Sequence, residues 1–234
     1  MSKPHLLLVP GLTCTAALWA PQVAAFSSHA TISIGDHTTA DTMAGIARVI
    51  LAAAPPRFAL AGLSMGGYIA FEIMRQAPDR VTHLALLDTG AKPFNQAQAP
   101  QRQALVELAN TVGMEATIAK LLPVFVHPSR LGDEPLVAVV KQMARDTGAA
   151  TFARQQTAIM SRPDSRPTLA DIRCPTLVLT GAQDLLTPVT EHREIAAGIA
   201  GARLEMIADC GHLSTLERPA AVNAAMARWL GVPV

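Results

Sequence analysis

Hydrophobic positions along the chain fall into short continuous runs separated by longer stretches with helical spacing. The short runs have the length and the aliphatic or β-branched character of buried strands. They lie at 6–9, 31–34, 58–61, 81–87, 176–180 and 203–207. Strands that alternate with helices are typical of an α/β fold, so we expect a three-layer sandwich with a mostly parallel sheet of about six strands.

Helices are predicted where apolar residues recur every three or four positions between these runs. The stretches lie at 42–53, 68–74, 189–200 and 220–230. Asp41 is expected to cap the first of them, and Pro188 stands at the first turn of the third. We expect these helices to cover both faces of the sheet.

The alternation of strands and helices stops once, between Pro93 and Pro167. Four helix-like stretches follow one another there without a convincing strand, at 101–110, 114–121, 136–146 and 151–160. An insertion that begins directly after a strand would lie over the carboxyl ends of the strands, where open α/β sheets bind ligands. We therefore expect a core of residues 1–92 and 168–234 and a helical lid of residues 93–167. A packing subdomain without substrate contact is the alternative.

Composition limits the classes of function. The 234 residues are 50% hydrophobic and 16% charged, with a formal net charge of +1, so a nucleic acid is not an expected partner. No apolar run approaches the roughly 20 residues of a membrane-spanning helix, so no membrane association is expected. The apolar run near the start is interpreted as a core strand and not as a signal peptide.

The cysteines give no sign of a metal or disulfide framework. Cys14, Cys174 and Cys210 are an odd, scattered set without the paired spacing that such sites require. We expect a cytoplasmic protein that needs neither a metal nor an organic cofactor.

A glycine-flanked serine gives the strongest chemical signal. In Gly62-Leu63-Ser64-Met65-Gly66-Gly67, Ser64 lies where the third strand meets a helix. A G-x-S-x-G sequence in this setting is typical of a nucleophile elbow, in which glycines allow the strand and helix backbones to approach closely. The motif also arises by chance, and Ser64 would then only cap the helix.

A serine nucleophile needs a histidine base and a carboxylate that orients the histidine. His212 lies in a loop between the last strand and the last helix, and Asp184 lies in the loop after the fifth strand. The order Ser64, Asp184, His212 is the order that the elbow fold uses. Asp88 also follows a strand and is the competing candidate for the acid.

Two backbone N–H groups are candidates for an oxyanion hole. The elbow geometry supplies the N–H of Met65, and the loop Pro10-Gly11-Leu12 after the first strand supplies that of Leu12. Substrate contacts are expected from Leu213 and from four apolar residues of the lid, although packing within the lid explains these four equally well. The four are Phe94, Phe125, Phe152 and Met160.

Taken together, these motifs resemble the α/β-hydrolase superfamily. The resemblance spans essentially the whole chain and is closest to small lidded members such as carboxylesterases, 3-oxoadipate enol-lactonase-like proteins and carbon–carbon bond hydrolases. It implies Ser64 as nucleophile, His212 as base, Asp184 as acid, and an acyl-enzyme formed from a small ester or lactone. Carbon–carbon bond cleavage, a thioesterase activity, cofactor-free oxygenase or lyase chemistry and a non-enzymatic ligand-binding receptor or scaffold are the alternatives.

The chain departs from the family pattern in two places. Pro10 stands where many members have a histidine before the oxyanion-loop glycine, but the backbone donor does not require that histidine. Members usually begin with an antiparallel pair of strands, whereas here the first strand starts almost at Met1. The sheet is therefore expected to be truncated, and its uncovered edge would favour helix cover or a homodimer.

Overall fold

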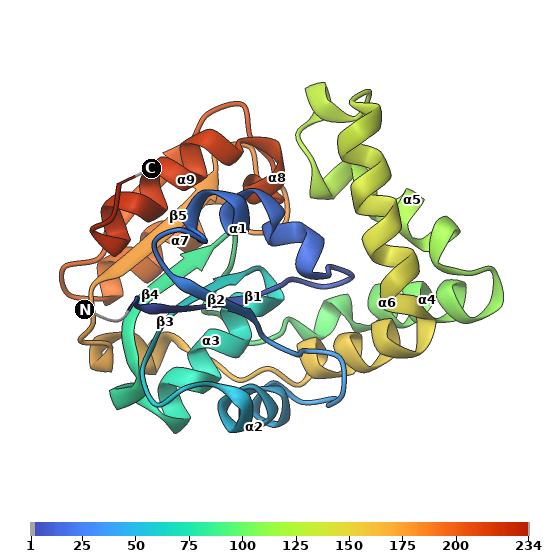
Figure 1. Cartoon of the computed structure of the whole chain (residues 1–234). Helices are drawn as coiled ribbons and strands as arrows, with labels where there is room; N and C mark the ends of the chain where they lie inside the picture. The colour runs from blue at the N-terminus through green and yellow to red at the C-terminus, as the bar shows by residue number, and fades with distance from the viewer. Residues whose placement is uncertain (1–2, 234) are drawn as a thin grey trace.

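The central sheet has six strands, all parallel, in the order β2-β1-β3-β4-β5-β6 (Figure 1). The computed structural model describes residues 3–233. The strands are β1 (His5–Val9), β2 (Thr31–Ile34), β3 (Phe58–Leu63), β4 (Val81–Leu87), β5 (Thr176–Gly181) and β6 (Arg203–Ile207). The α/β fold class and the six-stranded sheet are confirmed. β2 and β6 form the two edges, and the homodimer stays a prediction.

Helices pack on both faces of this sheet. They are α1 (Ala20–Phe26), α2 (Met43–Ala53), α3 (Met65–Gln76), α7 (Val189–Gly198), α8 (Ser214–Glu217) and α9 (Pro219–Leu230). Alternate residues of β1 point to opposite faces, so Leu6 and Leu8 pack in the core cluster of α1 and α9, whereas Leu7 and Val9 pack in that of α2, α3 and α7. This alternation within a continuous apolar strand is what a doubly covered parallel sheet requires.

Two details of the helices differ from the sequence prediction. Thr42, and not Asp41, caps α2, because the Thr42 side chain accepts a hydrogen bond from the N–H of Gly45 at 3.1 Å. Asp41 is one position too early for that bond. Helix α1 was not predicted, since its seven residues are too few to show a clear helical period.

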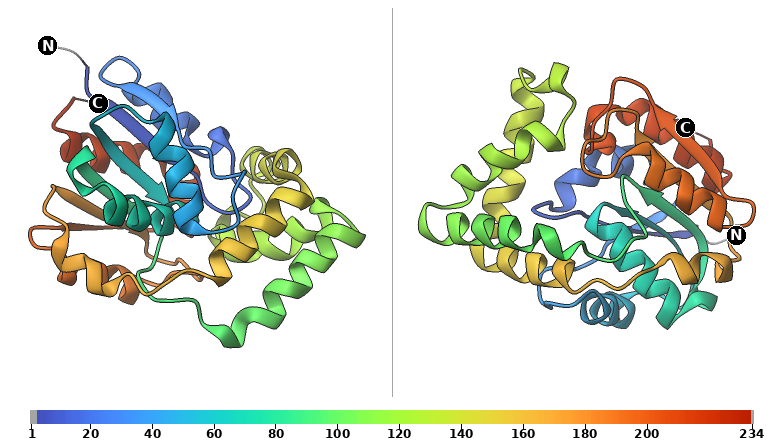
Figure 2. Two further views of the ribbon diagram at one scale, coloured as in Figure 1. Left: turned by 90° about the horizontal axis from the view of Figure 1, so that it is seen from below. Right: turned by 180° about the vertical axis from the view of Figure 1, so that it is seen from behind.

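The segment between β4 and β5 is helical, with α4 (Ala99–Thr111), α5 (Met114–Phe125) and α6 (Glu134–Met160). Figures 1 and 2 show these helices gathered together at one side of the sheet. α6 joins the two stretches predicted at 136–146 and 151–160, and Gly148, with φ 71° and ψ 160°, marks a kink between them. The predicted division into two helical stretches is confirmed, because the backbone leaves the helical conformation at Gly148.

Short 3-10 turns complete the chain at Ala16–Trp19, Pro78–Arg80, Gln96–Gln98, Pro128–Arg130 and Arg166–Asp171. Among residues 3–233, no helix combines the length and the apolar character that crossing a lipid bilayer would need.

Candidate active site

Ser64 occupies a strained turn between β3 and α3. Its backbone has φ 56° and ψ −114°, in the left-handed half of conformational space that non-glycine residues rarely adopt. Four hydrogen bonds hold the turn. Ser64 N–H donates to the Leu87 carbonyl at 2.9 Å, and the Ser64 carbonyl accepts from Thr89 Oγ1 at 2.8 Å, from the Gly67 N–H at 2.9 Å and from the Tyr68 N–H at 3.4 Å. A Cβ on Gly66 would overlap the carbonyl oxygen of Val9, so only glycine lets α3 lie this close to β1.

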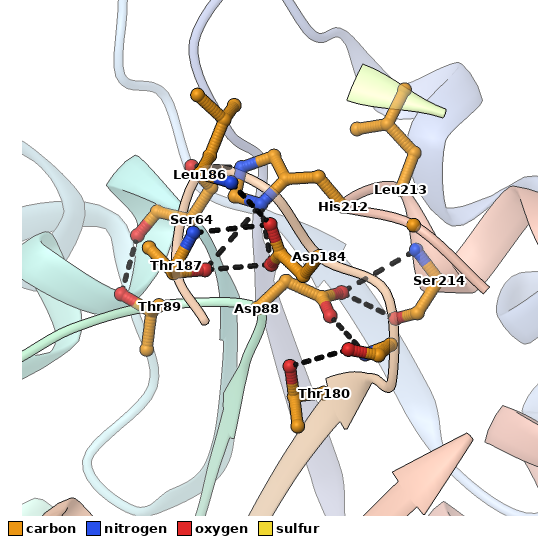
Figure 3. Close-up of polar contacts among 12 residues, drawn as sticks. Ser64, Asp88, Thr89, Thr180, Asp184, Leu186, Thr187, His212, Leu213 and Ser214 are labelled. Carbon is orange, nitrogen blue, oxygen red and sulfur yellow. Dashed lines mark hydrogen bonds and ion pairs between the residues drawn. The ribbon is translucent and has the colours of Figure 1, made fainter. Parts of the chain in front are cut away.

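A continuous chain of hydrogen bonds links Ser64, His212 and Asp184 (Figure 3). Ser64 Oγ lies 2.8 Å from His212 Nε2, and His212 Nδ1 lies 2.8 Å from Asp184 Oδ2. Asp184 is itself fixed, because its carboxylate accepts hydrogen bonds from the N–H groups of Leu186 at 2.8 Å and Thr187 at 3.0 Å and from Thr187 Oγ1 at 2.7 Å. The three residues come from three loops that follow β3, β5 and β6.

The charges around these three residues favour an ionised Asp184 carboxylate beside a basic His212 imidazole. Burial alone would lower the pKa of His212, but the adjacent Asp184 carboxylate outweighs burial and raises the pKa above its usual value. Burial alone would likewise raise the pKa of Asp184, but His212 and the Thr187 hydrogen bonds lower it overall. Asp184 therefore stays negative over the range in which His212 titrates.

Asp88, the competing acid, has a different set of partners. It is fully buried; its Oδ1 accepts a hydrogen bond from the Gly181 N–H at 2.9 Å, and its Oδ2 lies 2.5 Å from Ser214 Oγ. Burial, reinforced by the negative charge of Asp184, raises the pKa of Asp88 to about 8. Asp88 thus ties the loop after β4 to those after β5 and β6, while His212 Nδ1 is bonded to Asp184.

The two expected oxyanion donors border Ser64. A Cβ built on Gly11 would lie 3.3 Å from Ser64 Cβ, so the loop after β1 passes directly beside the serine. Within the described part of the chain, neither the Leu12 N–H nor the Met65 N–H has a hydrogen-bond acceptor. The Met65 N–H is among the first donors of α3, which have no partner inside the helix. Both groups are therefore available to a negatively charged oxygen.

Cys14 also borders this site but is a poor nucleophile. Its side chain is 3% exposed, and burial raises the pKa of the thiol to about 12. A protonated, buried thiol behaves as a small apolar side chain.

A buried carboxylate that sequence reasoning missed braces the His212 loop. Glu217, 2% exposed in α8, accepts hydrogen bonds from the N–H groups of Gly211 at 3.1 Å and Leu213 at 3.2 Å, on either side of His212. Its second oxygen accepts the His127 N–H at 2.7 Å, which ties this loop to the end of α5. The spacing of five residues from His212 was visible in the sequence, but only the folded loop shows where the carboxylate points.

Removing this brace should destabilise the protein. We expect Glu217→Ala to lower the free energy of unfolding by about 2 kcal/mol or more, because the N–H groups of Gly211 and His127 lose their acceptor while that of Leu213 keeps the Phe125 carbonyl. The midpoint of urea denaturation measures the change. Glu107→Ala, at an exposed position of α4, is the matched control and should leave the midpoint nearly unchanged. Equal midpoints for the two variants would contradict a bracing role.

A cavity of about 370 Å³ opens above Ser64 and His212, between the strand ends and the inserted helices. Three of the apolar residues named from the sequence line it: Leu12, Phe125 and Leu213. The Phe125 ring centre lies 6.0 Å from that of His212. The cavity has the size of a small-molecule site.

The other three expected substrate contacts lie outside this lining. Phe152 is fully buried in the core cluster that contains α5 and α6, Phe94 is 6% exposed, and Met160 packs against the cluster around α2 and α3. Their side chains pack in or against the two core clusters, so periodicity alone did not separate lining from packing positions. The lining contains eight polar or charged residues that sequence reasoning did not select: Tyr68, Lys92, Asn95, Gln98, Arg102, Arg162, Thr187 and Glu191.

Comparison with known proteins agrees with this architecture. The sequence profile of the Alpha/beta hydrolase family matches residues 6–225. A Mycobacterium tuberculosis protein whose name describes it as a non-heme bromoperoxidase, BpoC, is 33% identical over 204 residues, which cover 82% of this chain and 75% of that protein.

Two solved structures are similar over nearly the whole chain. An esterase from Thermogutta terrifontis, with malate bound, has a TM-score of 0.90 and 27% identity and covers 98% of this chain and 90% of its own. The enol-lactonase from Burkholderia xenovorans LB400 has a TM-score of 0.88 and 28% identity and covers 99% of this chain and 92% of its own. With the profile match across the sheet, the elbow and the His212 loop, the chain belongs to the alpha/beta hydrolase family.

Proposed function

We propose that this protein is a serine hydrolase that cleaves a small carboxylic ester or lactone through an acyl-enzyme. The observation that carries the proposal is the pair of 2.8 Å hydrogen bonds that joins Ser64 to His212 and His212 to Asp184. The relatives named as an esterase and an enol-lactonase support the same class of bond.

In the first half of the reaction, Ser64 Oγ attacks the substrate carbonyl carbon while its proton moves to His212 Nε2. The carbonyl oxygen becomes negative and accepts hydrogen bonds from the N–H groups of Leu12 and Met65. His212 then donates its proton to the departing alkoxide oxygen. The acyl group remains on Ser64 as an ester, and in a lactone the released alcohol stays attached to that acyl group.

In the second half, a water molecule takes the place of the alcohol. His212 Nε2 accepts a proton from this water, whose oxygen attacks the acyl carbon, and a second oxyanion forms at the same two donors. Collapse of the intermediate returns the proton to Ser64 Oγ and releases the carboxylic acid. Asp184 keeps Nδ1 protonated and stabilises the imidazolium in both halves.

Covalent labelling tests the proposal. A fluorophosphonate probe should attach to Ser64 and to no other residue, and a short-chain 4-nitrophenyl ester should leave an acyl group on Ser64 that mass spectrometry detects after acid quenching. Labelling should fail below the pKa of His212, because the protonated imidazole cannot accept the serine proton. An unlabelled Ser64 in the folded protein at pH 8 would refute the acyl-enzyme mechanism.

A further inference from the structure

The cavity above Ser64 carries an excess of positive charge. Lys92, Arg102 and Arg162 line it, and Glu191 is the acidic residue in its lining. Lys92 is neutralised at the rim, where its Nζ lies 3.7 Å from both Glu191 and Glu194. Within residues 3–233, Arg102 and Arg162 have no carboxylate partner within ion-pair distance.

The two guanidinium groups are held in place by aromatic rings. The central carbon of each lies over the Phe94 ring, 5.6 Å (Arg102) or 5.5 Å (Arg162) from the ring centre. Arg162 also lies 4.5 Å from the centre of the Tyr68 ring. A guanidinium over an aromatic face is attracted to the ring without consuming its N–H donors. Phe94, expected from the sequence to contact substrate, thus positions two cations instead.

Few of the donors on these two side chains are used inside the protein. Arg102 Nη1 donates to Gln156 Oε1 at 2.7 Å, while Arg162 donates to the carbonyls of Lys92 at 3.2 Å and Ile159 at 3.4 Å. A guanidinium has five N–H donors, so several remain on each side chain. Gln156, the partner of Arg102, is fully buried, and its Nε2 lacks a hydrogen-bond acceptor among the described residues.

The arrangement costs free energy when no anion is bound. Two like charges share one ring and a partly desolvated site. Burial lowers the pKa of Arg102, and the charge of Arg162 lowers it further, although the group stays protonated at any physiological pH. Proteins retain unneutralised, oriented arginines of this kind where an anion will be bound.

We propose that Arg102 and Arg162 form a carboxylate-binding subsite, so that the substrate is an ester or lactone bearing a second, ionised carboxylate. This inference rests on the proposed hydrolase function of the same cavity. The planar forks of the two guanidinium groups match a carboxylate in a way that a lysine would not. The apolar residues Leu12, Phe125 and Leu213 contact the carbon chain, while Ser64 attacks the other carbonyl.

The position of Arg102 places this subsite on the side of the inserted helices. Arg102 lines both the cavity above Ser64 and an adjoining, mainly apolar cavity of about 580 Å³ between α4, α5 and α6. Ser64 and His212 line the first cavity and do not line the second. The charged end of the substrate therefore lies toward the insertion, and its reacting carbonyl lies at the strand ends.

A pair of ester substrates tests the subsite. Mono-4-nitrophenyl glutarate carries a terminal carboxylate, and 4-nitrophenyl hexanoate is a neutral ester of similar length. The wild-type kcat/KM should be at least about 10-fold higher for the glutarate, since hydrogen bonds between ionised groups are stronger than those between neutral groups. Arg102→Gln and Arg162→Gln should each lower the glutarate value by about 10- to 100-fold, chiefly through KM, and change the hexanoate value by less than about 3-fold.

Matched variants distinguish a loss of substrate binding from a loss of folding. Arg145→Gln removes an exposed lid arginine that pairs with Glu115 and should leave both substrates unaffected. Arg102→Lys and Arg162→Lys keep the charge but lose the fork, so they should restore part of the glutarate preference. If the preference for the glutarate over the hexanoate is unchanged in the Gln and Lys variants of both Arg102 and Arg162, the proposed subsite is wrong.

The outcomes separate this inference from the proposed function. If wild type hydrolyses both esters equally, and the arginine variants do the same, the subsite is wrong and the hydrolase stands. If neither ester is hydrolysed and Ser64 is not labelled, the hydrolase proposal fails. Calorimetric titration with glutarate then decides the subsite alone: binding that is lost in Arg102→Gln and Arg162→Gln supports it, and absence of binding to wild type refutes it.

Discussion

Replacing Ser64 with alanine is expected to lower kcat/KM for a short-chain aryl ester by about 10⁴-fold or more. The variant keeps the N–H groups of Leu12 and Met65 and the cavity, so a small residual rate above the uncatalysed reaction should persist. What it loses is the oxygen that forms the acyl-enzyme. Initial rates with 4-nitrophenyl butyrate, measured at a pH where His212 is neutral, give the ratio.

The fold of this variant should be intact. Ser64 makes no side-chain cap to α3, so its replacement costs one partly exposed hydroxyl and leaves the backbone turn unchanged. The thermal midpoint is therefore expected to stay within a few degrees of wild type. Ser28→Ala, in an exposed turn, is the matched control for rate and stability. Substantial turnover by a folded Ser64→Ala variant would show that another group attacks the substrate.

Replacing Asp184 with asparagine should lower kcat by about 10³- to 10⁴-fold, because an amide no longer enforces the imidazole tautomer or stabilises the imidazolium. The variant should also move the pH profile. The base must be neutral, so activity is lost as the pH falls through the pKa of His212, which Asp184 holds above 6.5 in the wild type. Without that carboxylate, burial lowers the pKa, and the acid limb of kcat/KM should shift to lower pH.

Asp88→Asn is the discriminating comparison for this prediction. Asparagine resembles a protonated carboxyl group in shape, and the pKa of Asp88, at about 8, keeps that group largely protonated over the acid limb. We expect a loss of less than about 10-fold in kcat and little movement of the limb, since His212 Nδ1 is bonded to Asp184. Full kcat/KM profiles between pH 5 and 9 distinguish the two carboxylates. A large loss in Asp88→Asn alone would assign the orienting role to Asp88.

The positions of the strands were predictable because a parallel sheet covered on both faces needs unbroken apolar runs. The runs at 6–9 and 81–87 correspond to β1 and β4 almost residue for residue. The helical segment between β4 and β5 was predictable because no strand-like run interrupts its helical patterns. Its division at 147–150 was also predictable, because the helical pattern lapses there and the kink of α6 lies at Gly148.

The candidate nucleophile, base and acid could be selected from local rules of sequence. Glycine spacing marked Ser64, and loops at strand ends marked Asp184 and His212. Arg102, Arg162 and Glu217 could not be selected in this way, since an arginine or a glutamate ordinarily faces solvent. Their significance depends on which neighbours the folded chain brings to them, such as the Phe94 ring that both guanidinium groups approach.

The hydrogen bonds between the end of α5 and the His212 loop have a consequence for engineering new specificities. The proposed reacting groups all lie on loops of the sheet, whereas Phe125 and Arg102 come from the segment between β4 and β5. A library that exchanges this segment could therefore sample new substrates on the same three groups. The junction at 125–127 is the exception: Phe125 accepts the Leu213 N–H at 3.0 Å, and the His127 N–H binds Glu217 at 2.7 Å. A chimera that keeps these three residues retains the hydrogen bonds that hold the His212 loop. A chimera that replaces them must supply other contacts to that loop.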